Sequence, residues 1–372
     1  MIDVYEVKTK RDRKVFILLP EKIHRHHAQW IHPLYIDEYE FFDPSRNPAF
    51  RNCDTIMLLS RKDGRVNGRI MGIINHAYNA LHGEDNARFC FLDTENDPQT
   101  VHTLLQAVEE WARKKGQKKI VGPLAFSEKE PQGLMIEGFD EKIVLATHCN
   151  FEWLPQFVSN SGYGKEKDLV SYLFPVPASN PRFIQVINQR LENNSHWKVS
   201  HFTNRKQLKP WVVPVFRLIN EAYKHIYGFQ PLTEEEMHQY AKRYIPLLNP
   251  HFVKIIGDQD KRVYGFVISL PELSDGIRKA KGRLLPLGWW YILRASARSK
   301  MLTLLLGAVD EQYRNKGLDA LLTAAIFDAA RKRGITQIDS HLILETNWVM
   351  RAECERNQGR LHKRYRIFSK RL

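Results

Sequence analysis

Two stretches of the chain repeat one order of apolar and polar positions. In the first, residues 88–93 form a mainly apolar run that predicts a strand, and residues 119–122 predict a second, shorter strand. Between them, apolar side chains recur at helical spacing. These are Val101, Leu104, Leu105, Val108 and Trp111. Asp97 and Pro98 suit the N-cap and first turn of that helix, and Gly116 suits its end.

The second stretch begins with the continuous apolar run 301–309, which predicts a central strand buried on both faces. A polar loop at 310–316 leads into another helix, Gly334 ends it, and residues 337–344 predict the next strand. The apolar face of this helix consists of Leu318, Leu321, Leu322, Ala325 and Ala329. The two stretches match in length, with 23 and 24 positions from strand end to helix end. We therefore predict a repeated strand–helix–strand unit.

Each unit also has an upstream hairpin pattern. Residues 55–60 and 69–75 predict two strands around a turn, as do residues 252–256 and 263–270. A proline-rich stretch at 174–181 lies midway and predicts a linker.

These elements predict an α/β (α+β) chain of two tandem domains, in which strands alternate with helices. We place the first domain at residues 1–177 and the second at 178–372.

Composition narrows the class of protein. No apolar run reaches the roughly 18 to 20 residues of a membrane span, and the charged start of the chain does not resemble a secretory signal. The four cysteines are scattered, which predicts reduced thiols and a cytoplasmic location. His24, His26 and His27 lie close together on one predicted helix without matching carboxylates, so we predict no metal site.

The formal net charge is +14, which favours partners that carry phosphate: nucleic acid, anionic lipid or a phosphorylated cofactor. Cations are densest near the C-terminus. They are Arg356, Arg360, Lys363, Arg364, Arg366, Lys370 and Arg371. A solvated basic face explains this cluster as well as a specific anion site does.

The loop before the second helix has the features of an anion cradle. The first N–H groups of a helix have no internal partner, and the helix dipole adds positive potential there. Gly317 lets the backbone approach a ligand closely, and Arg314 and Lys316 add charge. The alternative is an ordinary strand-to-helix loop.

This segment resembles the Gcn5-related N-acetyltransferase (GNAT) superfamily, which binds acyl-CoA pyrophosphate with the pattern Gln/Arg-x-x-Gly-x-Gly/Ala at this junction. Arg314 and Gly317 match the pattern, and Asp319 departs from it. Asn347, Gly359 and the aromatic run 363–368 continue the likeness downstream, which spans about residues 252–369.

The resemblance implies two tandem GNAT-like domains, each a mixed, mostly antiparallel twisted sheet flanked by helices. It also implies acetyl-CoA or another acyl-CoA as co-substrate and a small-molecule or peptide amine as acceptor. The implied cofactor-binding residues are Ala308, Val309, Tyr313, Arg314, Asn315, Lys316, Gly317, Leu318, Asp319 and Asn347.

Attack of an amine on a thioester needs a base, a group that polarises the carbonyl and an acid for the thiolate. By the resemblance, the backbone N–H of Ala308 or Val309 polarises the carbonyl. Glu345 is the candidate base because it ends a predicted strand, where open α/β sheets place ligands. Tyr365 is the candidate acid. Glu345 also suits a helix cap, and Tyr365 suits the core.

The corresponding loop of the N-terminal half, residues 92–98, is acidic and lacks glycine, which predicts a lost cofactor site. An insertion follows at 122–139, and it either lines an acceptor cleft or forms a surface excursion. A second insertion, at 284–293, is apolar and flanked by Arg283 and Arg294. It suits a lid, an interfacial segment on a membrane, or a run packed under a helix.

Three functions fit these patterns. The first is an acyl-CoA-dependent N-acyltransferase. The second resembles the aminoacyl-tRNA-dependent transferases that build peptidoglycan, which the net charge and Asp319 favour, and whose partner is tRNA. The third is a non-catalytic binding protein on the same scaffold, which the acidic N-terminal loop favours.

Overall fold

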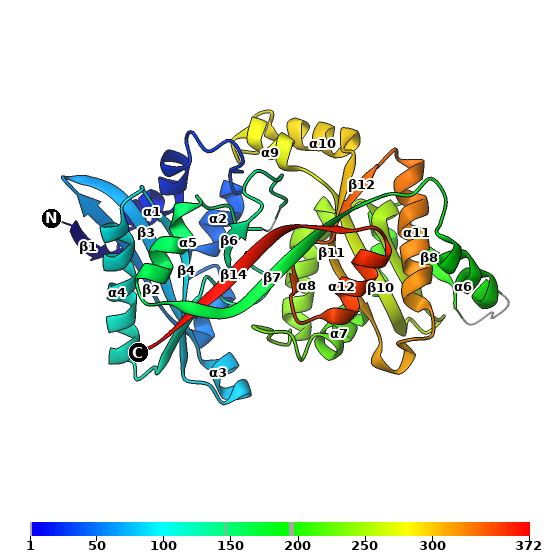
Figure 1. Ribbon diagram of the computed structural model, residues 1–372, viewed down its shortest axis with the longest axis horizontal. Helices are drawn as coiled ribbons and strands as arrows, with labels where there is room; N and C mark the ends of the chain where they lie inside the picture. The colour runs from blue at the N-terminus through cyan, green and yellow to red at the C-terminus, as the bar shows by residue number, and fades with distance from the viewer. Residues whose placement is uncertain (1, 146, 193–196) are drawn as a thin grey trace.

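The computed structural model describes residues 2–145, 147–192 and 197–372 (Figure 1). The strands are β1 (Ile2–Glu6), β2 (Cys53–Lys62), β3 (Arg65–Asn75), β4 (Asn86–Thr94), β5 (Lys119–Gly122), β6 (Leu134–Glu137), β7 (Gly164–Pro175), β8 (Val199–His201), β9 (Val253–Gly257), β10 (Val263–Pro271), β11 (Met301–Val309), β12 (Gln337–Asp339), β13 (Ile343–Leu344) and β14 (Arg360–Arg371).

The α-helices are α1 (Lys10–Ile23), α2 (Tyr35–Phe41), α3 (His76–His82), α4 (Pro98–Lys114), α5 (Trp153–Asn160), α6 (Arg182–Glu192), α7 (Val212–Ala222), α8 (Glu234–Tyr244), α9 (Ser274–Ala280), α10 (Gly288–Arg298), α11 (Leu318–Lys332) and α12 (Trp348–Arg356). Short 3-10 turns are η1 (Pro48–Asn52), η2 (Arg205–Trp211), η3 (Ile245–Leu247), η4 (Pro250–Phe252) and η5 (Glu311–Tyr313). No helix in the described ranges is long and apolar enough to cross a bilayer.

The described strands form one sheet in the order β1-β2-β3-β4-β5-β14-β7-β12-β11-β10-β9-β8, with β6 beside β14 and β13 beside β7. The sheet is mostly antiparallel. The exceptions are the pairs β4–β5 and β11–β12, which are parallel and are connected by α4 and α11. These two crossovers are the repeated strand–helix–strand units, so the predicted α/β class and tandem arrangement are confirmed.

The boundaries of the repeated elements follow local sequence signals. Asp97 caps α4, accepting from Gln99 N at 3.2 Å, as predicted. The predicted strand 337–344 is instead divided into β12 and β13. Between them His341 has a positive φ of 58°, and its N–H donates to Asp339 Oδ1 at 2.7 Å, which turns the chain.

The two longest strands join the halves. β7 and β14 pair antiparallel through the middle of the molecule (Figure 1), and each continues into both halves. The last residues of β14 pair with β5, and the last residues of β7 pair with β12. Each half therefore completes its sheet with a strand from the other. The boundary predicted between residues 177 and 178 follows β7 in the chain and stays a prediction.

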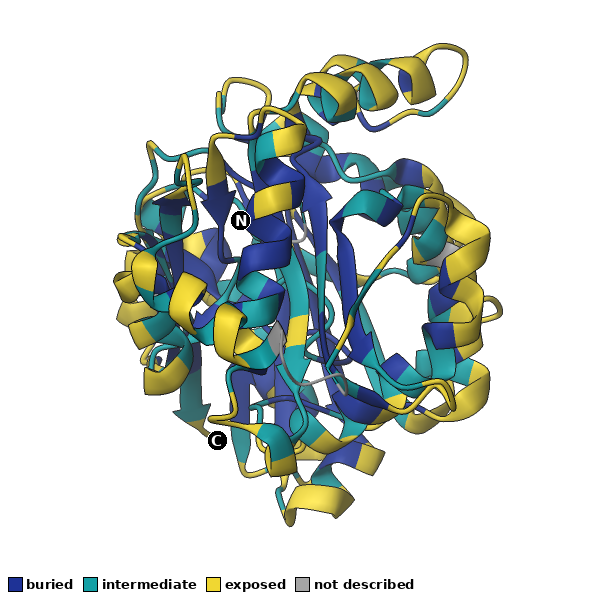
Figure 2. Cartoon of the chain, turned by 90° about the vertical axis from the view of Figure 1, so that its right-hand side faces the viewer, coloured by how far each residue is buried: buried dark blue, intermediate teal, exposed yellow. Residues whose placement is uncertain are grey.

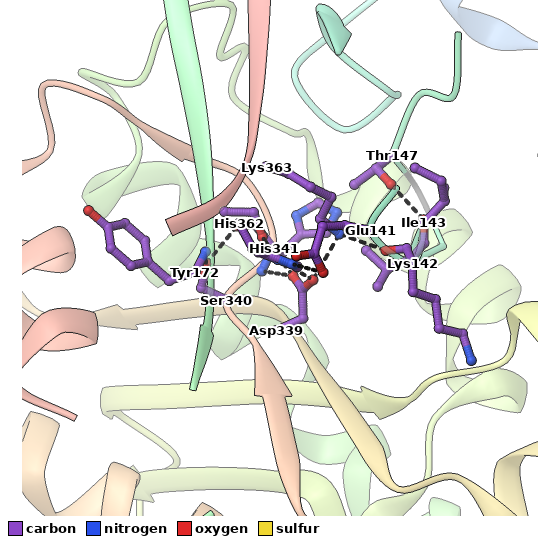
Figure 3. Close-up of polar contacts among 12 residues, drawn as sticks. Glu141, Lys142, Ile143, Thr147, Tyr172, Asp339, Ser340, His341, His362 and Lys363 are labelled. Carbon is purple, nitrogen blue, oxygen red and sulfur yellow. Dashed lines mark hydrogen bonds and ion pairs between the residues drawn. The ribbon is translucent and has the colours of Figure 1, made fainter. Parts of the chain in front are cut away.

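A buried polar network lies where β7, β12 and β14 meet (Figure 3). Asp339 and Lys363 have fully buried side chains, and Lys363 Nζ lies 3.0 Å from Asp339 Oδ2. His362 Nε2 lies 3.0 Å from the same oxygen, and Ser171 Oγ donates to the other carboxylate oxygen at 2.9 Å. Glu141, from the N-terminal half, lies 3.3 Å from His362 Nδ1. The network therefore ties both halves to the shared strands.

Candidate active site beside the open edge of β11

Strand β11 separates from its parallel neighbour β12 along most of its length. The strands pair only at residues 301–303, and β11 continues to Val309. A bulge at Leu305 bends the strand where this separation begins. Beyond it the strand is at most half-buried, and Gly307 is exposed. The predicted burial of 301–309 on both faces is therefore wrong for its second half, because β12 ends and leaves that edge open.

In the N-terminal half, β4 and β5 diverge in the same way, but the residues that follow β5 fill the space beside β4. After β5, residues 122–126 pass along β4, and Leu124 N donates to Phe89 O at 2.9 Å. The filling side chains are almost fully buried. They are Leu124 (0% exposed), Ala125 (1%) and Phe126 (4%). The start of the 122–139 insertion is thus a core segment and not a surface excursion. The C-terminal half, by contrast, leaves the edge of its central strand β11 open.

The two helices that follow the central strands also differ at their N-termini. The carboxylate of Asp97 accepts from Gln99 N and, at 2.8 Å, from Thr100 Oγ1, and Lys62 neutralises it at 2.7 Å. The cap residue of α11 is Gly317, with a φ of 86°, and it makes no side-chain capping bond. The first-turn N–H groups of α11 are therefore left for another acceptor, as an anion cradle requires.

The loop before α11 carries exposed cations beside aromatic rings. Arg314 and Lys316 are exposed, and Lys316 Nζ lies 4.8 Å from the centroid of the Tyr313 ring. That ring packs edge-on against Trp197 and Tyr264. The predicted cofactor residues 313–317 are contiguous here, and Asn315 adopts a left-handed φ of 62°.

Helix α6 covers one side of this loop. A Cβ atom on Gly317 would lie 2.6 Å from Ile187 Cγ2 and 3.1 Å from Leu191 Cδ1. Glycine is therefore required by this close packing as well as by its φ angle. Leu318 is fully buried behind the loop, whereas Asp319 is exposed in the first turn of α11.

Two of the predicted cofactor residues, Asp319 and Asn347, lie close to α12. Burial is the main cause that raises the pKa of Glu353 on α12, and the nearby Asp319 carboxylate raises it further. Asp319 therefore lies toward α12. Asn347 is the N-cap of α12, because its Oδ1 accepts from Met350 N at 3.2 Å. Its side chain is engaged there as a helix cap.

The open edge of β11 presents backbone N–H groups. Gly307 N donates to Tyr223 Oη at 3.2 Å, and Tyr223 Oη donates to Gly307 O at 3.1 Å. Alternate residues of a strand present their N–H to the same edge, so the N–H of Val309 also faces the gap. Ala308 instead faces β10, where it pairs with Phe266. Of the two groups predicted to polarise a carbonyl, Val309 faces the gap, and Gly307 joins it there.

Curated proteins of similar sequence cover nearly the whole chain. Protein YghO of Escherichia coli (strain K12) is 27% identical over 370 residues, 98% of this chain and 94% of that protein. The bacterial ceramide synthase of Caulobacter vibrioides (strain NA1000 / CB15N) is 28% identical over 382 residues, 100% of this chain and 98% of that protein. No protein-family model matches the chain.

A solved tandem GNAT protein from the clavulanic acid biosynthesis pathway covers all of this chain and 98% of its own, at 13% identity and a TM-score of 0.57. The chain has the tandem GNAT fold. A GCN5-related N-acetyltransferase from Sphaerobacter thermophilus agrees, with 12% identity, a TM-score of 0.51 and coverage of 100% and 95%. The resemblance inferred from the loop at 314–319 is thereby confirmed at the level of the fold.

Within this tandem GNAT fold, the predicted base, Glu345, lies in the turn after β13 and beside the shared strands, and the predicted acid, Tyr365, lies on β14. Glu345 forms ion pairs with Lys165 of β7 and, at 3.1 Å, with Arg364 of β14. Its polar contacts are thus with β7 and β14, and its carboxylate is held by two cations. Tyr365 is fully buried, and burial raises its pKa well above the usual value. The structure does not bring either side chain into contact with the loop before α11.

Two side chains that the sequence did not single out lie near the open edge. Tyr223 follows α7, and burial raises its pKa to about 12. The carboxylate of Glu128, on the N-terminal insertion, lies close enough to raise that pKa further. The Glu128 side chain is 9% exposed, and its Oε1 lies 2.7 Å from Lys129 Nζ. Among the described residues, none donates a hydrogen bond to its Oε2. No local motif marks either residue, because the fold alone brings them together.

The N-terminal half of the tandem GNAT fold contains a histidine cluster around Asp93. His24 Nε2 and Arg69 Nε lie 3.1 and 2.8 Å from the carboxylate. His24 Nδ1 lies 3.0 Å from His27 Nδ1. Burial lowers the pKa of His27 and of nearby His148 to about 4. Among the described residues, no group of histidine, cysteine and carboxylate side chains has the arrangement of a metal site.

This cluster predicts a fall in stability at mildly acid pH. The unfolded chain protonates His148 near pH 6.5, whereas the folded chain does so near pH 4, so stability falls as the pH decreases between these values. Between pH 7 and pH 5 the free energy of unfolding should therefore decrease, and we expect His148→Gln to make this decrease smaller by about 1 kcal/mol. The effect is no larger because the ring is partly exposed to solvent. Urea unfolding at both pH values measures this. If His148→Gln loses as much stability between pH 7 and pH 5 as the wild type does, His148 is not the cause of the loss.

Proposed function

We propose that this protein is an acyl-CoA-dependent N-acyltransferase whose C-terminal half binds the thioester beside β11. One observation carries the proposal: the central strand has an open edge next to a helix with an uncapped N-terminus. The N-terminal half closes the same edge with residues 122–126 and caps the equivalent helix with Asp97. We therefore assign the cofactor to the C-terminal half, with its phosphates near Arg314 and Lys316.

In the proposed reaction the nitrogen of a primary amine attacks the carbonyl carbon of the thioester. A C–N bond forms, the C–S bond breaks, and the products are an amide and free CoA. The N–H of Val309 would stabilise the oxyanion, whereas the N–H of Gly307 holds the Tyr223 hydroxyl beside it. We propose that Glu128 accepts the amine proton. The hydroxyl of Tyr223, which stays protonated at neutral pH, would donate a proton to the leaving thiolate.

The name of the Caulobacter relative supports a choice of acceptor. A ceramide is a long-chain amino alcohol that carries a fatty acyl chain in amide linkage, so its synthesis is an N-acylation. Because that relative aligns with 100% of this chain, we propose a long-chain amino alcohol as the acceptor and a fatty acyl-CoA as the donor. We propose a cytoplasmic location, where acyl-CoA is available.

The first test is calorimetric titration with acetyl-CoA and with a long-chain acyl-CoA. The double variant Arg314→Glu/Lys316→Glu should weaken binding at least tenfold, since it reverses two charges at the cradle. Arg65→Glu/Lys114→Glu makes the same change in net charge on exposed residues of the N-terminal half and serves as the control. We choose charge reversal because a larger side chain at Gly317 would collide with α6.

The second test is mass spectrometry of the product after incubation with a fatty acyl-CoA and a long-chain amino alcohol. An N-acyl product is the expected result. Binding of acyl-CoA without any amide product would retain the cofactor site and reject the acceptor. No binding of either acyl-CoA would reject the proposal, and salt-sensitive binding of aminoacyl-tRNA would then favour the second function inferred from the sequence.

A further inference from the structure

The insertion before β11 forms a pair of helices that stands out from the rest of the molecule (Figure 2). It consists of α9 and α10, and we refer to residues 274–300 as the α9–α10 hairpin. The two helices pack closely, since a Cβ atom on Gly276 would lie only 2.7 Å from Ile292 Cα. The apolar run 284–293 falls in the connection and the first turns of α10.

One face of this hairpin is apolar and uncovered. Its large apolar side chains are Leu285 (80% exposed), Leu287 (56%), Trp289 (50%), Trp290 (43%) and Leu293 (56%). They account for five of the twelve large apolar residues recorded as exposed in the described chain. Contiguous exposed apolar groups of this size mark a docking surface rather than ordinary scatter. The run is therefore not packed under a neighbouring helix, which was one of the alternatives for this segment.

From residue 276 onward, the charged side chains of the hairpin are all cations. Residues 276–309 contain no aspartate or glutamate. They contain seven cations, Arg278, Lys279, Lys281, Arg283, Arg294, Arg298 and Lys300. Two of these have carboxylate partners outside that range, Arg278 with Asp275 and Arg283 with Glu21. Among the described residues, no ion pair is recorded for the remaining five.

The base of the hairpin is fixed to the N-terminal half. Tyr35 N donates to Gly282 O at 3.0 Å, and Ser274 Oγ donates to Ile143 O at 2.9 Å. Lys142 Nζ lies 2.9 Å from Asp275 Oδ2. These contacts hold α9 and leave the apolar face of α10 pointing outward. The face is therefore presented by a supported element and not by a loose loop.

We propose that the α9–α10 hairpin docks this protein on an anionic membrane surface. Trp289, Trp290 and the nearby leucines would enter the boundary between headgroups and acyl chains. The surrounding lysines and arginines would contact lipid phosphates. Tryptophan and arginine favour this interface because each combines an apolar body with a polar end. The absence of carboxylates from residues 276–309 selects an anionic lipid surface over a basic or neutral partner.

Vesicle flotation tests this proposal without any acyl-CoA, so its outcome is independent of the proposed reaction. Wild-type protein should float with vesicles of phosphatidylcholine mixed with phosphatidylglycerol, and much less with phosphatidylcholine alone. Trp289→Ala/Trp290→Ala should lower the bound fraction at least tenfold, and so should Arg294→Glu/Arg298→Glu. Trp348→Ala is the matched control, because Trp348 is 66% exposed on α12, away from the hairpin.

Two results would overturn the proposal. One is the absence of wild-type protein from the floating fraction at low salt. The other is equal flotation of the wild type and both hairpin variants, with their helix content shown to be intact by circular dichroism. Light scattering tests whether a second copy of this chain, and not a membrane, covers the apolar face. A dimer that the tryptophan variant dissociates, without vesicle binding by the wild type, would assign this face to self-association and also reject the membrane.

Discussion

Replacing Lys363 with methionine is expected to lower the free energy of unfolding by about 3 to 5 kcal/mol, because it leaves the Asp339 carboxylate buried without its main counter-charge. Burial alone would raise the pKa of Asp339, but the Lys363 ammonium and His362 hold it well below the usual range. Both partners are fully buried, so water cannot replace the lost ammonium. Urea or thermal unfolding measures the loss.

Lys165→Met is the control for this prediction. Lys165 lies on the same strand pair and forms ion pairs with Asp168 and Glu345, but its side chain is 41% exposed. We expect a loss below about 1 kcal/mol there. The double variant Asp339→Asn/Lys363→Met should recover part of the stability lost in Lys363→Met. Equal losses for Lys363→Met and Lys165→Met would show that the buried pair is not a main support of the junction.

Replacing Tyr223 with phenylalanine is expected to lower kcat about a hundredfold with little change in KM for the acyl-CoA. The substitution removes the hydroxyl that we propose as the proton donor to the thiolate, and it retains the ring that packs near Phe229. Release of free CoA thiol under steady-state conditions measures both constants. The comparison presupposes the amide-forming activity proposed above.

Tyr227→Phe is the matched control for Tyr223. It lies in the same segment and is also largely buried, but its hydroxyl lies 3.3 Å from Glu166 and not beside Gly307. If both variants lose activity to the same extent, the effect of Tyr223→Phe is structural. A raised KM with kcat unchanged would make Tyr223 a residue that positions the thioester, and proton donation would fall to another group.

Local patterns predicted the repeated units well. Asp97 and Pro98 specify the start of α4 through capping chemistry, and the apolar spacing that follows specifies its buried face. The apolar spacing also located α11, and Gly317 was singled out because glycine lets the backbone approach a ligand closely; its φ of 86° is a finding of the structure. Each of these signals acts over a few residues and can therefore be read from one sequence.

Other features depend on contacts between distant residues. The residues at 122–126 look like a loop, yet Leu124 fills the gap beside β4, which only the fold reveals. Gly307 looked like one more residue of a buried strand, and its exposure follows from the early end of β12. The pairing of β14 with β5 joins segments about 250 residues apart, and no local pattern encodes such a register.

The pairing of β14 with β5 has a consequence for synthesis on the ribosome. β14 is the last of the described strands in chain order, yet it completes the sheet of the half that is made first. Until it emerges, the nascent N-terminal half carries an unpaired edge on β5, and such edges invite pairing with other chains. We therefore expect the first half to remain dependent on chaperones until β14 has been synthesised. For the same reason, separating the two halves genetically would divide strands that each half needs.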